Sequence, residues 1–144
     1  MMRSPRIMSR NMGMTVEVTS GVMATLLQEA EREHPHECCG LLLGRGESID
    51  RAVPAANVHR DPASHFEIDP AALIAAHKIQ RAGGKELLGY YHSHPLGPAV
   101  PSATDRQQSS GDGRIWAIVA NGSVGWWRDT ASGFTALPLR LVEG

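Results

Sequence analysis

Two histidines and an aspartate in the stretch HSHPLGPAVPSATD have the residue types and spacing of a metal site. His92 and His94 are one residue apart, and Asp105 follows after ten further residues. In a β-strand, residues i and i+2 project from the same face with Cα atoms about 6.5–7 Å apart, so both imidazoles can point at one ion. The proline-containing loop then delivers Asp105, and two imidazoles with one carboxylate favour zinc over calcium or magnesium. The pattern predicts a catalytic zinc site with a fourth position open to water.

The spacing alone leaves a structural interpretation of these residues open. The segment SATD fits the S-x-x-[DE] pattern of a capping box, in which Ser102 and Asp105 would only begin a helix. The two histidines could equally be hydrogen-bonded side chains near the end of a strand. Residues outside this stretch are needed to separate the two interpretations.

Glu37 favours the metal site. It stands directly before CCGLLLG, which is apolar at successive positions and therefore typical of a strand covered on both faces. An ionised carboxylate entering such a region is costly unless a cation or hydrogen-bond donors compensate it. Beside a metal-bound water, the carboxylate could take the water's proton and later give it to a leaving amine. The alternative is a solvated turn residue after His36.

The apolar periodicity predicts an α/β domain in which a mixed sheet is flanked by two or three helices. Strands are expected at MTVEVTS, CCGLLLG, SIDRAVPAANV, ELLGYYHSH, IWAIVA, VGWWR and FTALPLRLV. Helices are expected after Ser20 as N-cap, from Pro70 to the glycine pair 83–84, and from about Ser102. CCGLLLG is the expected central strand, and Pro54 is expected to mark an edge or a bulge in its neighbour.

Composition and charge are those of an ordinary globular protein of one domain. The 144 residues are 42% hydrophobic and 20% charged, with a formal net charge of -1. Neither nucleic acid nor a membrane is expected as a partner, because the charge is balanced and no apolar run could span a bilayer. Cys38 and Cys39 are adjacent and poorly placed to bridge, which favours a cytoplasmic protein. Residues 1–13 carry arginines without acids and are expected to be a disordered tail before a domain over residues 14–144.

Two other groups of residues are expected to have structural roles and not to form a second site. The segment EREHPHECC is rich in possible ligands, but structural zinc sites usually draw on two separated ligand pairs, so no second metal site is expected. Cys39 would share a strand face with Leu41 and Leu43 in the core. Of Trp126 and Trp127, one is expected in the core and the other facing outward, where it could contact a partner.

Glu37 together with the segments ECCGLLLG, HFEIDP and YYHSHPLGPAVPSATD resembles the JAMM (MPN+) zinc metallopeptidase family, particularly its short prokaryotic members. The family pattern, a glutamate followed far downstream by H-[ST]-H-x7-S-x2-D, is met at every position. The resemblance spans about residues 15–142. It implies the JAB/MPN architecture, a mixed sheet flanked by helices as in cytidine deaminases. Deaminase chemistry itself is not expected, because no H-x-E is followed by a P-C-x-x-C and the two cysteines are adjacent.

The resemblance also implies roles for five residues. His92, His94 and Asp105 match the family's zinc ligands, with one Zn²⁺ per chain and a bound water as nucleophile. Glu37 matches the general acid/base, and Ser102 matches the hydroxyl that hydrogen-bonds the tetrahedral oxyanion. The chain would therefore be a zinc metallopeptidase.

The implied substrate is a ubiquitin-like sulfur-carrier protein or its conjugate. Hydrolysis would follow the carrier's C-terminal Gly-Gly and release a short tail, an attached cysteine or a conjugated lysine, with the flexible tail lying beside the sheet as an added strand. The alternative is a non-catalytic scaffold of the MPN type, and a metal-storage or metal-sensing module is a third interpretation. Neither alternative has a physical need for both Glu37 and Ser102 beside the converging ligands.

Overall fold

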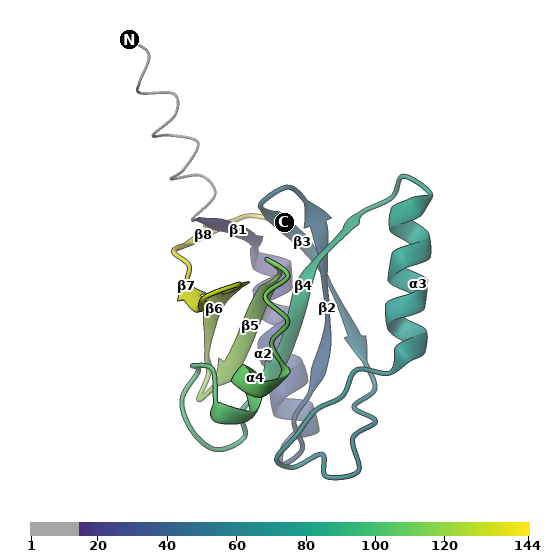
Figure 1. Cartoon of the computed structure of the whole chain (residues 1–144). Coiled ribbons are helices and arrows are strands. Elements are labelled where there is room, and N and C mark those ends of the chain that lie inside the picture. Colours follow the sequence, from purple (N-terminus) through teal and green to yellow (C-terminus); the bar gives the residue numbers. More distant parts are fainter. Residues whose placement is uncertain (1–14) are drawn as a thin grey trace.

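The computed structural model describes residues 15–144, and over this range the chain forms one mixed sheet of eight strands with three helices (Figure 1). The strands are β1 (Val16–Thr19), β2 (Cys39–Arg45), β3 (Ser48–Ala55), β4 (Glu86–Ser93), β5 (Ile115–Ala120), β6 (Ser123–Thr130), β7 (Gly133–Ala136) and β8 (Leu139–Val142). The helices are α2 (Ser20–Glu33), α3 (Pro70–Arg81) and α4 (Ala103–Gln108). The predicted mixed sheet flanked by helices is confirmed, whereas the expected tail over residues 1–13 lies outside the described residues. None of these three helices has the length and apolar composition needed to cross a membrane.

The sheet is curled so that its two edges are joined by a dipeptide. Its strand order is β7-β6-β5-β4-β2-β3-β1-β8, yet only Leu137 and Pro138 separate the two edge strands in the chain. The Leu137 N–H donates to the Trp126 carbonyl of β6 at 2.9 Å. The Pro138 carbonyl accepts from the Val16 N–H of β1 at 3.0 Å. The expectation of one strand over FTALPLRLV is therefore wrong, because Pro138 has no N–H to continue the ladder and the chain crosses from one edge to the other there.

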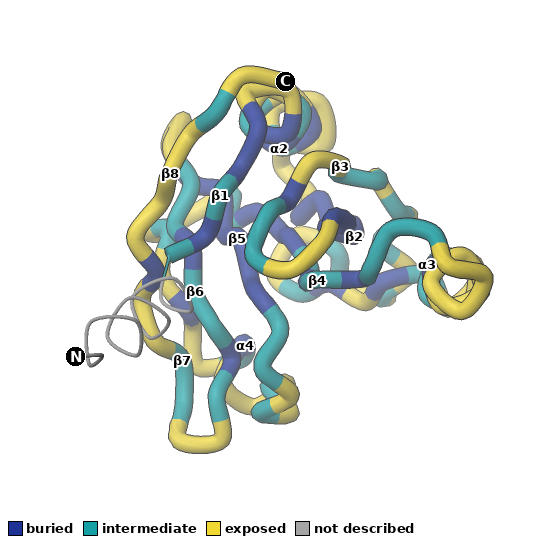
Figure 2. The backbone as a smooth tube through the Cα atoms, turned by 90° about the horizontal axis from the view of Figure 1, so that it is seen from above, coloured by how far each residue is buried: buried dark blue, intermediate teal, exposed yellow. Residues whose placement is uncertain are grey.

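Helices cover both faces of the curled sheet, with α2 on the inner face and α3 on the outer face. The inner core contains Val16, Val18, Val22, Leu26, Cys38, Leu42, Ile49, Tyr91, Ile115, Ala117, Val119, Trp126 and Leu137. The outer core contains Cys39, Leu41, Leu43, Phe66, Ile68, Ala76, Leu87 and Trp116. Figure 2 shows the buried strands between the helices and the largely exposed turns of α3. The first six residues of β2 are buried, which confirms CCGLLLG as the central strand.

Local capping and proline chemistry set the element boundaries near the site. The N-cap of α2 is Thr19, whose side chain accepts from the Val22 N–H at 3.2 Å, so the expected cap at Ser20 is wrong by one residue. Thr19 still has the extended backbone of β1, which is the conformation an N-cap needs. Pro54 lies in the part of β3 that pairs with β2 alone, because β1 pairs only with Ser48 and Ile49. This confirms the predicted edge.

Gly89 lies where β4 pairs with β5, and this position has no room for a side chain. A Cβ on Gly89 would overlap the carbonyl oxygen of Ile115, its partner in the parallel ladder. Gly89→Ala should therefore force the two strands apart and lower the free energy of unfolding by about 2–4 kcal/mol, measured by urea denaturation. Gly83→Ala is the control, because Gly83 has a φ of 89° but open space around it, and it should cost only about 1–2 kcal/mol. Equal losses would show that crowding at Ile115 is not the cause.

Candidate metal centre

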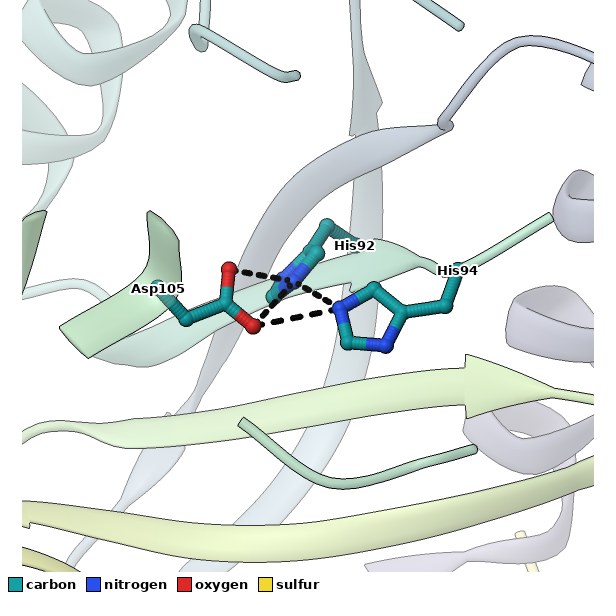
Figure 3. Close-up of side chains that lie close together, drawn as sticks. All are labelled: His92, His94 and Asp105. Carbon is teal, nitrogen blue, oxygen red and sulfur yellow. Dashed lines mark hydrogen bonds and ion pairs between the residues drawn. The ribbon is translucent and has the colours of Figure 1, made fainter. Parts of the chain in front are cut away.

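Three side chains converge at the end of β4 (Figure 3). His92 Nε2 lies 3.1 Å from His94 Nε2 and 3.2 Å from Asp105 Oδ2. His94 Nε2 lies 3.1 Å from Asp105 Oδ2. Atoms bound to a tetrahedral zinc ion at about 2.0–2.1 Å are about 3.3 Å apart, so these three separations fit three corners around one ion. Within residues 15–144, this is the only group of three or more His, Cys, Asp or Glu side chains that could hold a metal.

His92 is held in the middle of the sheet. It pairs with Cys39 of antiparallel β2 and with Ile118 of parallel β5. On the outer face its imidazole stacks on Phe66 at a centroid distance of 4.3 Å and meets the edge of Trp116 at 5.7 Å. Burial lowers the pKa of His92, so the ring is held in the neutral form that can bind a metal.

His94 follows β4 and continues its ladder with β5, because its N–H donates to the Val119 carbonyl at 2.8 Å. Its Nδ1 lies 2.8 Å from the Pro98 carbonyl oxygen. A carbonyl can only accept, so Nδ1 carries a proton and, in the neutral ring, the lone pair is on Nε2, which faces the other two side chains. Burial lowers the pKa of His94, but hydrogen bonds to Asp105 and to the Pro98 carbonyl outweigh it and the pKa is raised.

Asp105 belongs to the centre and to a helix cap at the same time. Ser102 is the N-cap of α4: its Oγ accepts from the Asp105 N–H at 3.0 Å, and its own N–H donates to Asp105 Oδ2 at 3.0 Å. The capping box and the converging ligand set therefore coexist. Burial raises the pKa of Asp105, but hydrogen bonds with His92 and His94 prevail and hold the pKa well below its usual range. Because the cap uses the Ser102 oxygen as an acceptor, the hydroxyl hydrogen remains available to donate.

Glu37 lies beside the centre, two residues before β2 begins. Cys39 pairs with His92, and the Ser93 N–H donates to the Cys38 carbonyl at 3.1 Å, so the chain that enters β2 runs beside the end of β4. The Glu37 side chain is buried, with 8% of the residue exposed. Burial raises the pKa of Glu37 to about 7, with His94 lowering it and Asp105 raising it. A carboxyl group with this pKa can both accept and donate a proton near neutral pH.

A cavity of about 320 Å³ opens beside these residues. It is lined by Glu37, Ala63, Ser64, His94, Pro95, Leu96, Pro98, Val100, Pro101, Ser102 and Thr104. One wall is thus the proline-containing loop 95–101, and the other is formed by Ala63 and Ser64. Glu37, His94 and Ser102, three of the five predicted site residues, border the cavity, while His92 and Asp105 are buried beside it.

Other sequence candidates lie apart from the centre. Cys38 packs in the inner core and Cys39 in the outer core, so EREHPHECC does not gather its possible ligands at one point. Trp126 is buried, as expected for one of the two tryptophans. The expectation that Trp127 faces outward is wrong, because it is half-buried and its Nε1 donates to the Ala99 carbonyl at 3.3 Å. The Ala99 and Pro98 carbonyls thus hold Trp127 and His94 by hydrogen bonds. Because these acceptors are backbone groups, no residue pattern in the sequence reveals them.

Comparison with known sequences identifies related proteins. The family of prokaryotic homologs of the JAB domain matches residues 19–130. Over 97 residues the chain is 39% identical to a probable TtuB-protein conjugate cleaving protease of Thermus thermophilus, covering 67% of this chain and 65% of that protein. Over 112 residues it is 30% identical to a desampylase of Haloferax volcanii, covering 76% of this chain and 81% of the relative.

Solved structures share the fold. A protein of Desulfitobacterium hafniense superposes with a TM-score of 0.79 at 29% identity, covering 90% of this chain and 94% of the other. A JAB1/MPN domain protein from Archaeoglobus fulgidus superposes with a TM-score of 0.60 at 20% identity, covering 90% and 98%. The predicted JAB/MPN architecture is confirmed.

The buried carboxylate of Glu37 predicts a pH-dependent stability of the metal-free protein. Its folded pKa of about 7 lies above the ordinary value of 4.5. The folded state therefore favours the protonated form, and this stabilisation is fully present below pH 4.5 and lost as pH rises through 7. Glu37→Gln should be more stable than the parent at pH 8 by about 1–2 kcal/mol and should have no such advantage near pH 4.5.

Urea denaturation in the presence of a chelator measures this difference at both pH values. Glu31→Gln makes the same change at an exposed position of α2 and is the control. A stability difference between Glu37→Gln and the parent that stays constant with pH would contradict the buried position of the carboxyl group.

Proposed function

Because the chain belongs to the family of prokaryotic homologs of the JAB domain, we propose that it is a zinc-dependent peptidase or isopeptidase, with residues 14–144 as its catalytic domain. Its substrate would be a ubiquitin-like or sulfur-carrier protein, cleaved at the amide bond after the C-terminal Gly-Gly. One observation carries this proposal: the buried Glu37 carboxyl group borders the same cavity as His94 of the converging His-His-Asp set. The names of the two relatives, a conjugate cleaving protease and a desampylase, support it.

The residues of the centre fit zinc. His92, His94 and Asp105 would be its three protein ligands, one ion per chain, as two imidazoles and a carboxylate suit this metal. When bound, zinc activates a water molecule for attack by lowering its pKa toward neutrality. The Pro98 carbonyl and the Ser102 N–H orient His94 and Asp105, and such bonds behind the ligands hold them in a binding geometry.

Glu37 and Ser102 would carry the proton and stabilise the developing charge. The Glu37 carboxylate can accept the proton of the attacking water and then transfer it to the nitrogen of the leaving amine. The Ser102 hydroxyl, whose hydrogen is not used by the helix cap, can donate to the oxyanion that forms on the scissile carbonyl. Both groups border the cavity that would hold the scissile bond.

The cavity suits the end of an extended tail, because its volume of about 320 Å³ has room for only a few residues. Leu96 is 90% exposed and Val100 43% exposed at this cavity, so apolar residues of the tail could contact them.

The open strand edge that lies beside Glu37 is that of β3. Both edges of β4 are occupied by β2 and β5, whereas β3 beyond Ile49 pairs with β2 alone. This open edge borders a second cavity, of about 640 Å³, whose lining includes Pro54, Ala55 and Glu37. A tail paired there would lie against a wall that reaches Glu37, although Pro54 would offer only its carbonyl.

The purified protein, dialysed against metal-free buffer, should hold about one zinc per chain by elemental analysis. His94→Ala should lose most of this zinc, because it removes one of three ligands. His77→Ala removes an exposed histidine of α3 and should bind zinc like the parent. A parent protein that holds no zinc and takes up none on titration would overturn the assignment and favour a scaffold.

The zinc-loaded protein should cleave a carrier fusion after its Gly-Gly, with the products identified by mass spectrometry. Glu37→Gln should keep its zinc but lose about 100- to 10,000-fold in kcat/KM, since the proton acceptor is gone. No cleavage of any Gly-Gly fusion, under conditions where the Haloferax desampylase is active, would sink the proposal.

A further inference from the structure

The Glu37 backbone is held by a loop segment and not by strand pairing. β2 begins only at Cys39, so Glu37 lies outside the ladder. Its N–H donates to the Pro62 carbonyl at 2.7 Å, and its carbonyl accepts from Asn57 Nδ2 at 3.0 Å. Both backbone polar groups of Glu37 therefore bond to the segment 57–67, which lies between β3 and α3.

Asn57 connects this segment to Glu37 with all of its side-chain hydrogen-bonding capacity. Its Nδ2 donates to the Glu37 and His65 carbonyls, each at 3.0 Å. Its Oδ1 accepts from the His59 and Glu67 N–H groups, each at 3.1 Å. Two donors and two acceptor lone pairs are the full inventory of an asparagine amide. Glutamine is longer by one methylene, and aspartate has the same shape but no N–H donors, so asparagine is the residue that fits this position.

From these contacts we propose that Asn57 is a positioning residue, which sets where the Glu37 carboxyl group stands relative to His94. The segment it braces also supplies Ala63 and Ser64, the cavity wall that faces loop 95–101. One side chain thus links the wall of the cavity to the residue that would carry the proton. This inference rests on the proposed function, in which a displacement of about 1 Å at a reacting group can cost 100-fold in rate.

The same segment has internal bonds that do not involve Glu37, and these provide a control. Ser64 Oγ donates to Asp61 Oδ2 at 2.7 Å, and the rings of His59 and His65 stack at a centroid distance of 4.7 Å. Removing the Asp61 side chain breaks that hydrogen bond and takes away a negative charge that raises the pKa of Glu37, but it removes none of the Asn57 contacts. If the segment only had to be ordered, losing the Asp61 contact should also lower kcat.

Asn57→Asp removes both Nδ2 donors and keeps an oxygen for the His59 and Glu67 amides. At pH 8, with a Gly-Gly fusion as substrate, kcat should fall about 10- to 100-fold while KM stays within about twofold. Asn57→Ala, which adds no charge, should lose at least as much. Asp61→Ala is the matched control and should keep kcat within about threefold of the parent. All variants should retain about one zinc, because none changes a ligand.

Backbone hydrogen exchange provides a readout that needs no activity. In Asn57→Asp, the Glu37 amide should exchange at least about tenfold faster than in the parent, while the amides of Leu41 and Leu43 in β2 keep their protection. In Asp61→Ala the Glu37 amide should be unchanged. Variants that bind zinc and melt cooperatively are folded, so a loss of kcat in them is not a loss of folded protein.

Equal losses of kcat in Asn57→Asp and Asp61→Ala, or an unchanged Glu37 exchange rate in Asn57→Asp, would overturn the positioning role. If the parent cleaves no Gly-Gly fusion, the proposed function fails. The exchange rate of the Glu37 amide still decides in that case whether Asn57 holds this residue.

Discussion

The convergence of three polar side chains, two of them buried, within hydrogen-bonding distance of one another is the constraint on which the rest of this structure depends. His92 is fully buried and Asp105 is 3% exposed, so neither can rely on water for compensation. Their mutual contacts, and those with His94, hold the pKa of Asp105 far below that of a buried isolated carboxyl group. Such an arrangement is stable only if the surrounding backbone holds each side chain in one orientation.

Three different devices supply that orientation. Strand pairing on both sides holds His92, because β4 lies between β2 and β5. A helix cap holds Asp105 through Ser102, and a loop carbonyl selects the tautomer of His94. Glu37 has the least regular support, since its two backbone bonds come from the segment 57–67. The residue proposed to move the proton is therefore the one whose position depends most on a loop.

Much of this site could be predicted because its determinants are local in the chain. The alternation of a strand puts His92 and His94 on one face, and the capping pattern of SATD begins a helix at Ser102. The central position of CCGLLLG followed from its unbroken apolar run. The division of FTALPLRLV into β7 and β8 could not be predicted from the sequence, because it depends on the curl of the whole sheet. The bracing role inferred for Asn57 was also missed, since all four of its partners are backbone groups that no residue pattern reveals.

The sequence by itself determined which side chains could bind a metal and which elements would carry them. Side-chain chemistry and periodicity are properties of short stretches, and they hold whatever the rest of the chain does. Only the tertiary structure decided that Glu37 borders the same cavity as His94 and Ser102, and that burial raises the pKa of Glu37 to about 7. Burial and register join residues more than fifty positions apart, so they exist only once the strands have paired and the loops have closed over them.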